Sequence, residues 1–111
     1  MIIHKADAKH IKKLGVDMHI YNAKCASVVL QETKRGHAEE FYHDKSTFLY
    51  YIIEGKGSWF IKGKEYKVKT GDLIVIEPNN KIYYKGKLKQ LLINVPAYEP
   101  EHEHHVRDIK I

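Results

Sequence analysis

Short runs of apolar and β-branched residues, separated by turn-forming residues, extend along most of the chain. The longest run, residues 48–53, contains only aromatic and aliphatic side chains, and residues 73–76 form a second run. Glycines follow the first run within residues 54–57, and proline and asparagine follow the second at residues 78–80. Because such residues favour turns, the pattern predicts a strand over each run and a hairpin turn at residues 54–57.

Shorter runs of the same kind predict the remaining strands. We expect them over residues 19–24, 25–33, 40–43, 58–62, 65–69, 81–85 and 89–95. About nine or ten short strands, with no helical periodicity between them, are typical of an all-β sandwich or barrel.

The length of 111 residues predicts one domain over residues 1–111, since a chain of roughly this size buries a single core. The motif-bearing core spans residues 36–95. Residues 1–15 are polar and mixed, so we expect a strand or turn that docks on this core. Residues 96–111 are expected to form a charged tail.

Two glycine-containing turns, each next to an apolar strand, also carry a family resemblance. They lie in residues 36–57, GHAEEFYHDKSTFLYYIIEGKG, and in residues 71–80, GDLIVIEPNN. In these stretches the sequence resembles the cupin family. The resemblance implies a cupin jelly-roll barrel, also called a double-stranded β-helix.

The metal-ligand positions of the cupin family are mostly filled by other side chains in this sequence. Alignment on the glycine of the first turn places the family's two histidines at Phe41 and His43 and its glutamate at Phe48. Alignment on the second turn places its last histidine at Tyr83. A catalytic metal is usually held by three protein ligands, and only His43 is retained. We therefore expect no bound metal and no other cofactor.

The resemblance implies a barrel interior that is aromatic, with two phenols and one imidazole. The ligand-binding residues expected there are Phe41, His43, Phe48, Tyr50, Ile52 and Tyr83. Such a surface suits stacking and hydrogen bonding with a small ring or carbonyl compound. The alternative is a barrel filled completely by its own side chains.

The chemistry of His43 stays open between three interpretations. It could transfer protons near neutral pH, be held structurally by a tyrosine or by Asp44, or act as a lone metal ligand. Metal-free cupin relatives that act on sugars or carbonyl compounds use histidine and tyrosine for proton transfer. The resemblance therefore implies His43, Tyr83 and Tyr50 as candidate catalytic residues.

Several functions fit these residues. The first is small-molecule binding by a metal-independent isomerase, epimerase or lyase acting on a sugar or carbonyl compound. The second is a non-catalytic ligand-binding or sensor module. The third is a metal-dependent cupin enzyme with non-standard ligands, for which His37, Glu39 and Glu40 are the nearest replacements. A pocket ligand that is chemically altered would separate the first from the second.

The histidines near the C-terminus form a separate cluster. His102, His104 and His105 alternate with Glu101 and Glu103, a metal-like composition without a recognised ligand spacing. We interpret the cluster as a solvated tail or a self-association contact, with metal binding as the alternative.

Composition and charge limit the partners. The formal net charge is +5, but 17 of the 19 basic residues are lysines, many of which alternate with apolar residues as on a solvated strand face. We therefore expect no nucleic-acid partner, and no apolar run is long enough for a membrane-spanning helix. The single Cys25 favours a reducing, cytoplasmic location. A homodimer is expected, because a small jelly roll has exposed sheet edges to cover.

Overall fold

The computed structural model describes all 111 residues, Met1–Ile111. They form nine β-strands and two 3₁₀ turns, and no helix is long and apolar enough to cross a membrane. The strands are β1 (Lys9–Lys13), β2 (Val16–Asn22), β3 (Ser27–Thr33), β4 (Glu39–His43), β5 (Thr47–Ile61), β6 (Lys64–Lys69), β7 (Leu73–Ile76), β8 (Ile82–Val95) and β9 (Glu103–Asp108). The 3₁₀ turns are η1 (Lys5–Asp7) and η2 (Pro100–His102).

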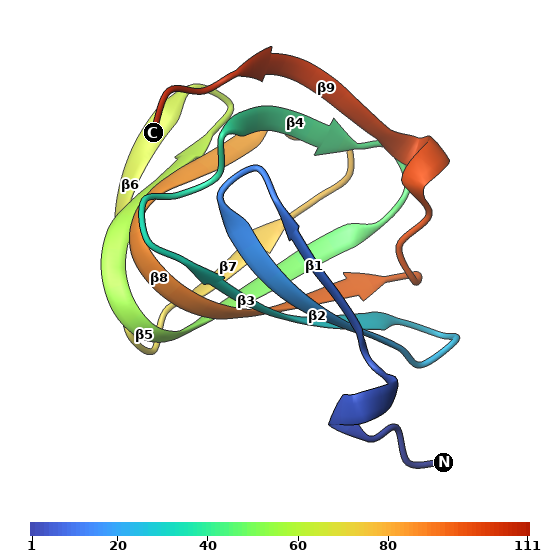
Figure 1. Ribbon diagram of the computed structural model, residues 1–111. Helices are drawn as coiled ribbons and strands as arrows, with labels where there is room; N and C mark the ends of the chain where they lie inside the picture. The colour runs from blue at the N-terminus through green and yellow to red at the C-terminus, as the bar shows by residue number, and fades with distance from the viewer.

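The two longest strands, β5 and β8, pair antiparallel with each other over almost their whole length. Their two halves belong to two sheets. One half joins the order β1-β2-β3-β8-β5-β7, and the other half joins β9-β4-β8-β5-β6. Both strands curl, which folds one sheet over the other and produces a barrel (Figure 1).

Residues 54–57 lie within β5 and do not form the predicted hairpin turn. A β-bulge between Ile52 and Glu54 bends the strand, which continues to pair with β8 on the far side. Gly55 has a φ of 107°, and a Cβ atom there would overlap the carbonyl oxygen of Lys87. This glycine therefore permits a bend and a close approach between two strands rather than a chain reversal. Similarly, the predicted strands 81–85 and 89–95 are parts of one strand, β8.

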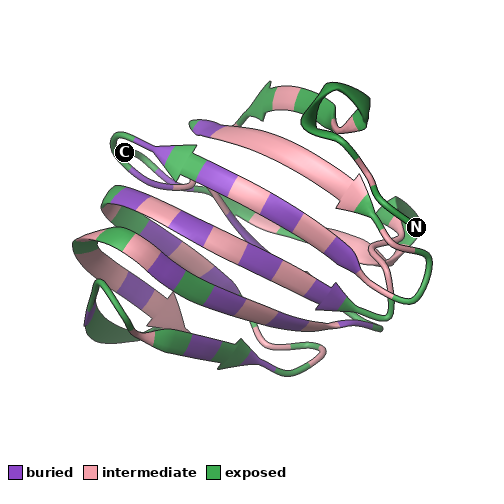
Figure 2. Cartoon of the chain, turned by 90° about the horizontal axis from the view of Figure 1, so that it is seen from below, coloured by how far each residue is buried: buried purple, intermediate pink, exposed green.

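Alternation of side chains along β5 and β8 determines what faces the interior. Figure 2 shows this alternation as stripes of buried and partly exposed residues along the strands. On β8 the even-numbered residues from Ile82 to Asn94 point inward, and the bulge in β5 changes its inward side from even to odd numbers. The largest fully buried rings, Trp59, Tyr50 and Tyr84, form the centre of the core.

The chain ends are also part of the barrel. Strand β1 forms a hairpin with β2. The expected charged tail contains β9, which pairs with β4 and covers one end of the structure (Figure 1). Its histidines and arginine meet carboxylates on β4 and in the segment after it, which supports this pairing.

Replacement of Gly55 by alanine should show how strongly the barrel depends on this strand approach. Gly55→Ala adds both positive-φ strain and overlap with Lys87, so the free energy of unfolding should fall by about 3 kcal/mol or more in urea denaturation. Gly63→Ala is the matched control, because Gly63 has a φ of 81° but no atom lies within 4 Å of the point where a Cβ would be placed. The free energy of unfolding of Gly63→Ala should fall by only about 1 kcal/mol. Equal losses would contradict the close-approach role.

Candidate functional site

A cavity of about 120 Å³ opens between the two sheets. Because one water needs roughly 10–15 Å³ on this scale, the cavity has room for a small organic ring. The β1–β2 hairpin contributes Ile11 and Met18, and the turn after β1 contributes Leu14. The aromatic part of the wall consists of Phe41, Phe48, Tyr50, Tyr84 and Tyr98.

His37 is placed at the cavity by the segment between β3 and β4. A Cβ atom on the preceding Gly36 would overlap the carbonyl oxygen of Tyr84, so glycine allows this segment to run against β8. The amide of His37 donates to the same carbonyl, at 2.9 Å. As a result, the imidazole of His37 lies beside the phenol ring of Tyr84, with ring centroids 5.4 Å apart.

The hydrogen bonding of His37 fixes which ring nitrogen is basic. Nδ1 lies 2.7 Å from the backbone oxygen of Glu39, which can only accept, so Nδ1 must carry the proton. In the neutral ring, Nε2 then keeps its free lone pair. Burial lowers the pKa of His37 below its ordinary value of 6.5, although the Glu39 backbone oxygen partly opposes this. The ring is therefore neutral and basic at pH 7.

Two buried phenols face the same cavity. The hydroxyl of Tyr84 donates to Oε1 of Gln31 at 3.2 Å, and Tyr50 lies 6.2 Å from Tyr84 between ring centroids. Burial raises the pKa of both phenols, so both keep their protons at neutral pH. The Tyr50 hydroxyl can donate a hydrogen bond to a ligand, whereas the Tyr84 proton is used by Gln31 and leaves the Tyr84 oxygen as an acceptor. Neither phenol acts as a phenolate base.

The charged groups at the cavity are two carboxyls and one amine. Glu39 and Glu103 line it together with Lys13. Burial raises the pKa of Glu103, and Glu39 raises it further, whereas a hydrogen bond from Tyr98 opposes the rise. Burial likewise raises the pKa of Tyr98. This charge balance favours a ligand without a phosphate group, because an anion would face two carboxyls.

Three of the six expected ligand-binding residues line the cavity, namely Phe41, Phe48 and Tyr50. Ile52 is fully buried in the core but does not line the cavity.

Tyr83 faces away from the interior, so the prediction that it faces the ligand is wrong. Its ring stacks on Phe60 at 4.4 Å, and the Arg107 guanidinium lies 5.6 Å from its centroid. Tyr84 occupies the inward position instead. The alignment was shifted by one residue, and a shift of one residue places a side chain on the opposite face of the strand.

His43 is buried beside the cavity with both ring nitrogens engaged. Nδ1 accepts the amide of Ser46 at 3.0 Å, and Nε2 donates to the backbone oxygen of Glu99 at 3.1 Å. Burial lowers the pKa of His43. The ring is therefore held by backbone atoms, and not by a tyrosine or by Asp44 as the structural interpretation supposed.

The interior does not fit the metal of the cupin pattern. Phe41 and Phe48 have no donor atom, His43 has no free nitrogen, and Tyr83 lies on the outer face. Among the replacement ligands, the carboxylate of Glu40 is bound by Arg107 at 2.8 Å.

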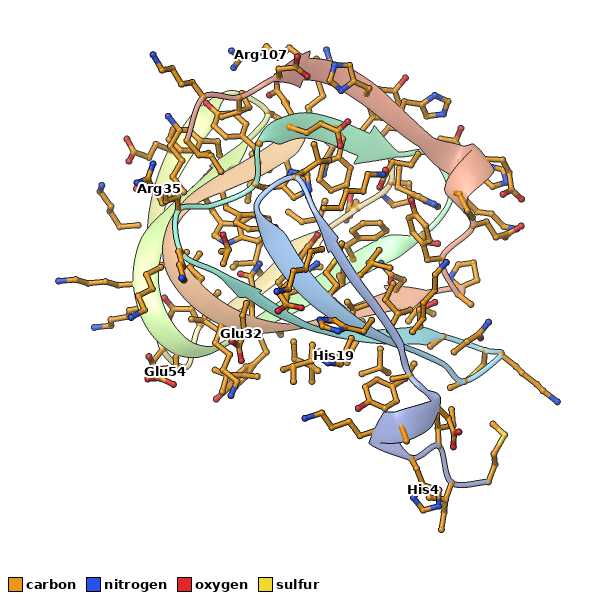
Figure 3. The ribbon with its side chains drawn as sticks, in the orientation of Figure 1. His4, His19, Glu32, Arg35, Glu54 and Arg107 are labelled. Carbon is orange, nitrogen blue, oxygen red and sulfur yellow. The ribbon has the colours of Figure 1, made fainter.

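Clusters of metal-ligand residues occur only outside the cavity. One consists of His10, Asp17 and His19 on the β1–β2 hairpin, and Figure 3 shows His19 on the outer side of the barrel. The other consists of Glu99, Glu101 and His102.

The C-terminal histidines form side-chain hydrogen bonds that hold β9 and the turn before it against the barrel. His102 and His104 both bond the carboxylate of Asp44, at 2.6 and 2.7 Å, and His105 bonds Glu39 at 2.6 Å.

Sequence reasoning named His37 only as a replacement metal ligand, and it did not select Tyr84, Tyr98 or Asn94. The signal for Tyr84 was present, since it shares the even numbering of the apolar residues Ile82, Leu88 and Leu92. His37 and Tyr98 lie outside the strands, where no alternation of side chains predicts which way a residue points.

The fold and the cavity together define a jelly-roll β-barrel with an aromatic site in its interior. Residues 28–86 match the family model for the cupin domain, so the chain belongs to the cupin family. The predicted fold class is thereby confirmed. A search among curated protein sequences gave no significant match.

Solved structures give a more specific similarity. Streptomyces Pac13, described as a nucleoside dehydratase, is 29% identical, with a TM-score of 0.94 over 99% of this chain and 93% of that chain. KdgF from Halomonas sp. is 12% identical, with a TM-score of 0.75 over 91% of this chain and 96% of that chain. Ectoine synthase from P. lautus is 15% identical, with a TM-score of 0.75 over 100% of this chain and 93% of that chain. The last two show similarity of fold.

Variants of Pac13 mark three positions in that protein. One structure with uridine carries a His→Gln substitution, and two others with uridine carry Tyr→Phe substitutions. These positions are separated by 13 and then 34 residues. His37, Tyr50 and Tyr84 have the same residue types and the same spacing in this chain.

The attachment of β9, which brings Glu103 to the cavity, should depend on Arg107. Arg107→Met would leave the buried carboxylate of Glu40 without its partner, and unpaired buried charges are strongly destabilising. We expect a clearly lower urea midpoint. Lys45→Met is the control, because it removes an exposed pair with Glu99 and should shift the midpoint little. Equal shifts would contradict a structural role for the buried pair.

Proposed function

We propose that this protein binds a neutral nucleoside in the cavity and removes water from it, as a metal-independent lyase of the dehydratase type. The observation that carries the proposal is that His37, Tyr50 and Tyr84 line one cavity and match the Pac13 positions in type and spacing. The aromatic wall suits stacking of a base, and the two carboxyls disfavour a phosphorylated ligand.

The chemistry assigned to the site is proton transfer by His37. Loss of water breaks a C–H bond and a C–O bond and forms a C=C bond, so a base must take one proton and an acid must supply one. Nε2 of His37 takes the proton from carbon, and the imidazolium then returns it to the departing hydroxyl. An imidazole removes a proton from carbon only where a neighbouring carbonyl group acidifies it, so the reacting nucleoside carries such a group.

The remaining polar groups orient the ligand. The hydroxyl of Tyr50 donates a hydrogen bond to the ligand, and the oxygen of Tyr84, whose proton is donated to Gln31, accepts one. Lys13 is the cation available to a developing oxyanion. The same proton-transfer group would serve an isomerase or epimerase acting on a sugar. Product analysis by mass spectrometry separates these reactions, because only dehydration changes the mass.

Exchange of His37 for glutamine should remove the proton-transfer group and keep the cavity. We expect kcat for dehydration of a carbonyl-bearing uridine to fall by about 10²–10⁴-fold, with uridine affinity changed less than about tenfold. In the wild type, kcat/KM should be constant above pH 7 and fall as pH drops through the lowered pKa of His37, where the base becomes protonated.

His43→Gln is the matched control for this experiment. Because His43 does not line the cavity, its variant should keep the acidic limb of the pH profile. If His43→Gln abolishes that limb and His37→Gln retains it, the assignment of the base is wrong.

We also propose a homodimer formed through the outer face of the β3-β8-β5-β7 part of the sheet. This face is apolar across several strands, and cross-strand register places Val28 beside Ile93, Leu49 beside Val75 and Tyr51 beside Leu73. Leu73 and Val75 are 60% and 55% exposed. A contiguous exposed apolar patch is a common feature of protein interfaces. For the location we propose the cytoplasm, supported by the free Cys25.

Charge on this face should prevent the dimer. We expect the double variant Leu73→Lys and Val75→Lys to raise the dimer dissociation constant at least about 100-fold, measured by sedimentation equilibrium. Tyr66→Lys, an exposed aromatic position on β6, is the control and should leave association unchanged. A wild type that stays monomeric at high micromolar concentration would contradict the proposal.

A further inference from the structure

Asn94 has an unusual environment for a buried amide. It lies on β8 between Ser27 of β3 and Phe48 of β5, faces the cavity and is 1% exposed. Neither its Nδ2 nor its Oδ1 has a hydrogen-bond partner within the chain. Buried polar groups are nearly always paired, and an unpaired one is costly. An amide with an unpaired donor and an unpaired acceptor therefore needs an explanation.

Other buried polar groups of the chain differ from Asn94 in an informative way. Trp59 and Gln90 each leave one atom unpaired, and neither lines the cavity. Gln31, which does line it, is satisfied, since its Oε1 accepts from Tyr84 and from Gln90 at 3.2 and 3.0 Å. Of the two buried amides at the cavity, Asn94 is thus the one whose hydrogen-bonding capacity remains available.

We propose that Asn94 recognises the adjacent C=O and N–H groups of a pyrimidine base such as uracil. This inference rests on the proposed nucleoside-binding function. The Asn94 Nδ2 donates to the carbonyl oxygen of the base while Oδ1 accepts its ring N–H. Two parallel hydrogen bonds satisfy both unpaired atoms at once, and such bidentate pairs between an amide and a base edge are a common recognition mode.

The surrounding rings agree with this orientation of the ligand. Phe48, the strand neighbour of Asn94, lies 6.5 Å from Tyr98 between ring centroids, and all three residues line the cavity. The ring centroid of Tyr50 lies 6.2 Å from that of Phe48, and the ring centroid of Tyr84 lies 6.2 Å from that of Tyr50. Tyr84 in turn lies beside His37. A base at Asn94 therefore directs the sugar toward the proton-transfer end of the cavity.

The test compares two ligands in two proteins by calorimetric titration. The ligands are uridine and 3-methyluridine, which lacks the ring N–H, and the proteins are the wild type and Asn94→Leu, a variant of similar shape without polar atoms. The wild type should bind uridine at least about tenfold more tightly than 3-methyluridine. In Asn94→Leu this ratio should fall to about one. The wild-type comparison needs no variant and stands even if Asn94→Leu does not fold.

Thermal stability without ligand gives an independent readout. Asn94→Leu should have an unchanged or higher Tm, because it removes two unpaired buried atoms. Gln31→Leu, the control, should have a lower Tm, since it leaves Tyr84 and Gln90 without their acceptor. A lower Tm for Asn94→Leu would assign the amide a structural role and overturn the inference.

The outcomes distinguish this inference from the function on which it rests. If the wild type binds uridine and His37→Gln blocks dehydration, but both ligands bind equally, only the role of Asn94 is wrong. If the wild type binds neither nucleoside, both proposals are wrong.

Discussion

The antiparallel pairing of β5 with β8 is the interaction on which the rest of the structure depends. These strands belong to both sheets, so their curl determines how the sheets face each other and where the cavity lies. The curl requires the two backbones to approach closely at Gly55, where any side chain would meet the carbonyl of Lys87. The bulge before this glycine also changes which residues of β5 point inward. One local backbone feature thus sets the shape of the barrel and the identity of its interior side chains.

Polar groups in the interior fall into two kinds, and the difference separates stability from function. Gln31, His43 and Glu40 have their hydrogen bonds completed by the chain itself, which stabilises the strands that carry them. His37 keeps a free nitrogen and Asn94 keeps an unpaired amide, both at the cavity. An unpaired buried polar group calls for an explanation, and at a cavity a bound ligand supplies one. These two groups at the cavity therefore mark the two ends of the proposed ligand, whereas Trp59 and Gln90, which also leave an atom unpaired, do not line it.

Much of the fold was predictable from the sequence, because alternation and turn residues are local signals. The strands at 40–43, 65–69 and 73–76 agree closely with β4, β6 and β7. The hairpin at 54–57 was wrong, since glycine serves equally for a turn, a bulge or a close contact, and only the partner strand decides which. The inward tyrosine was displaced by one position because Tyr83 and Tyr84 are adjacent and identical in type. His37 could not be selected over His43 from sequence, because the difference between them lies in hydrogen bonds to distant backbone atoms.

The protonation pattern of the two histidine rings tests the proposed site most directly, and long-range ¹H–¹⁵N correlation NMR measures it. We predict that His37 at pH 7 is protonated on Nδ1 and that its Nε2 signal shifts when uridine is added. His43 should be protonated on Nε2, the opposite tautomer, and its signals should move much less. A His37 ring protonated on Nε2, or a uridine response at His43 instead of His37, would contradict the assignment of the base and of the site.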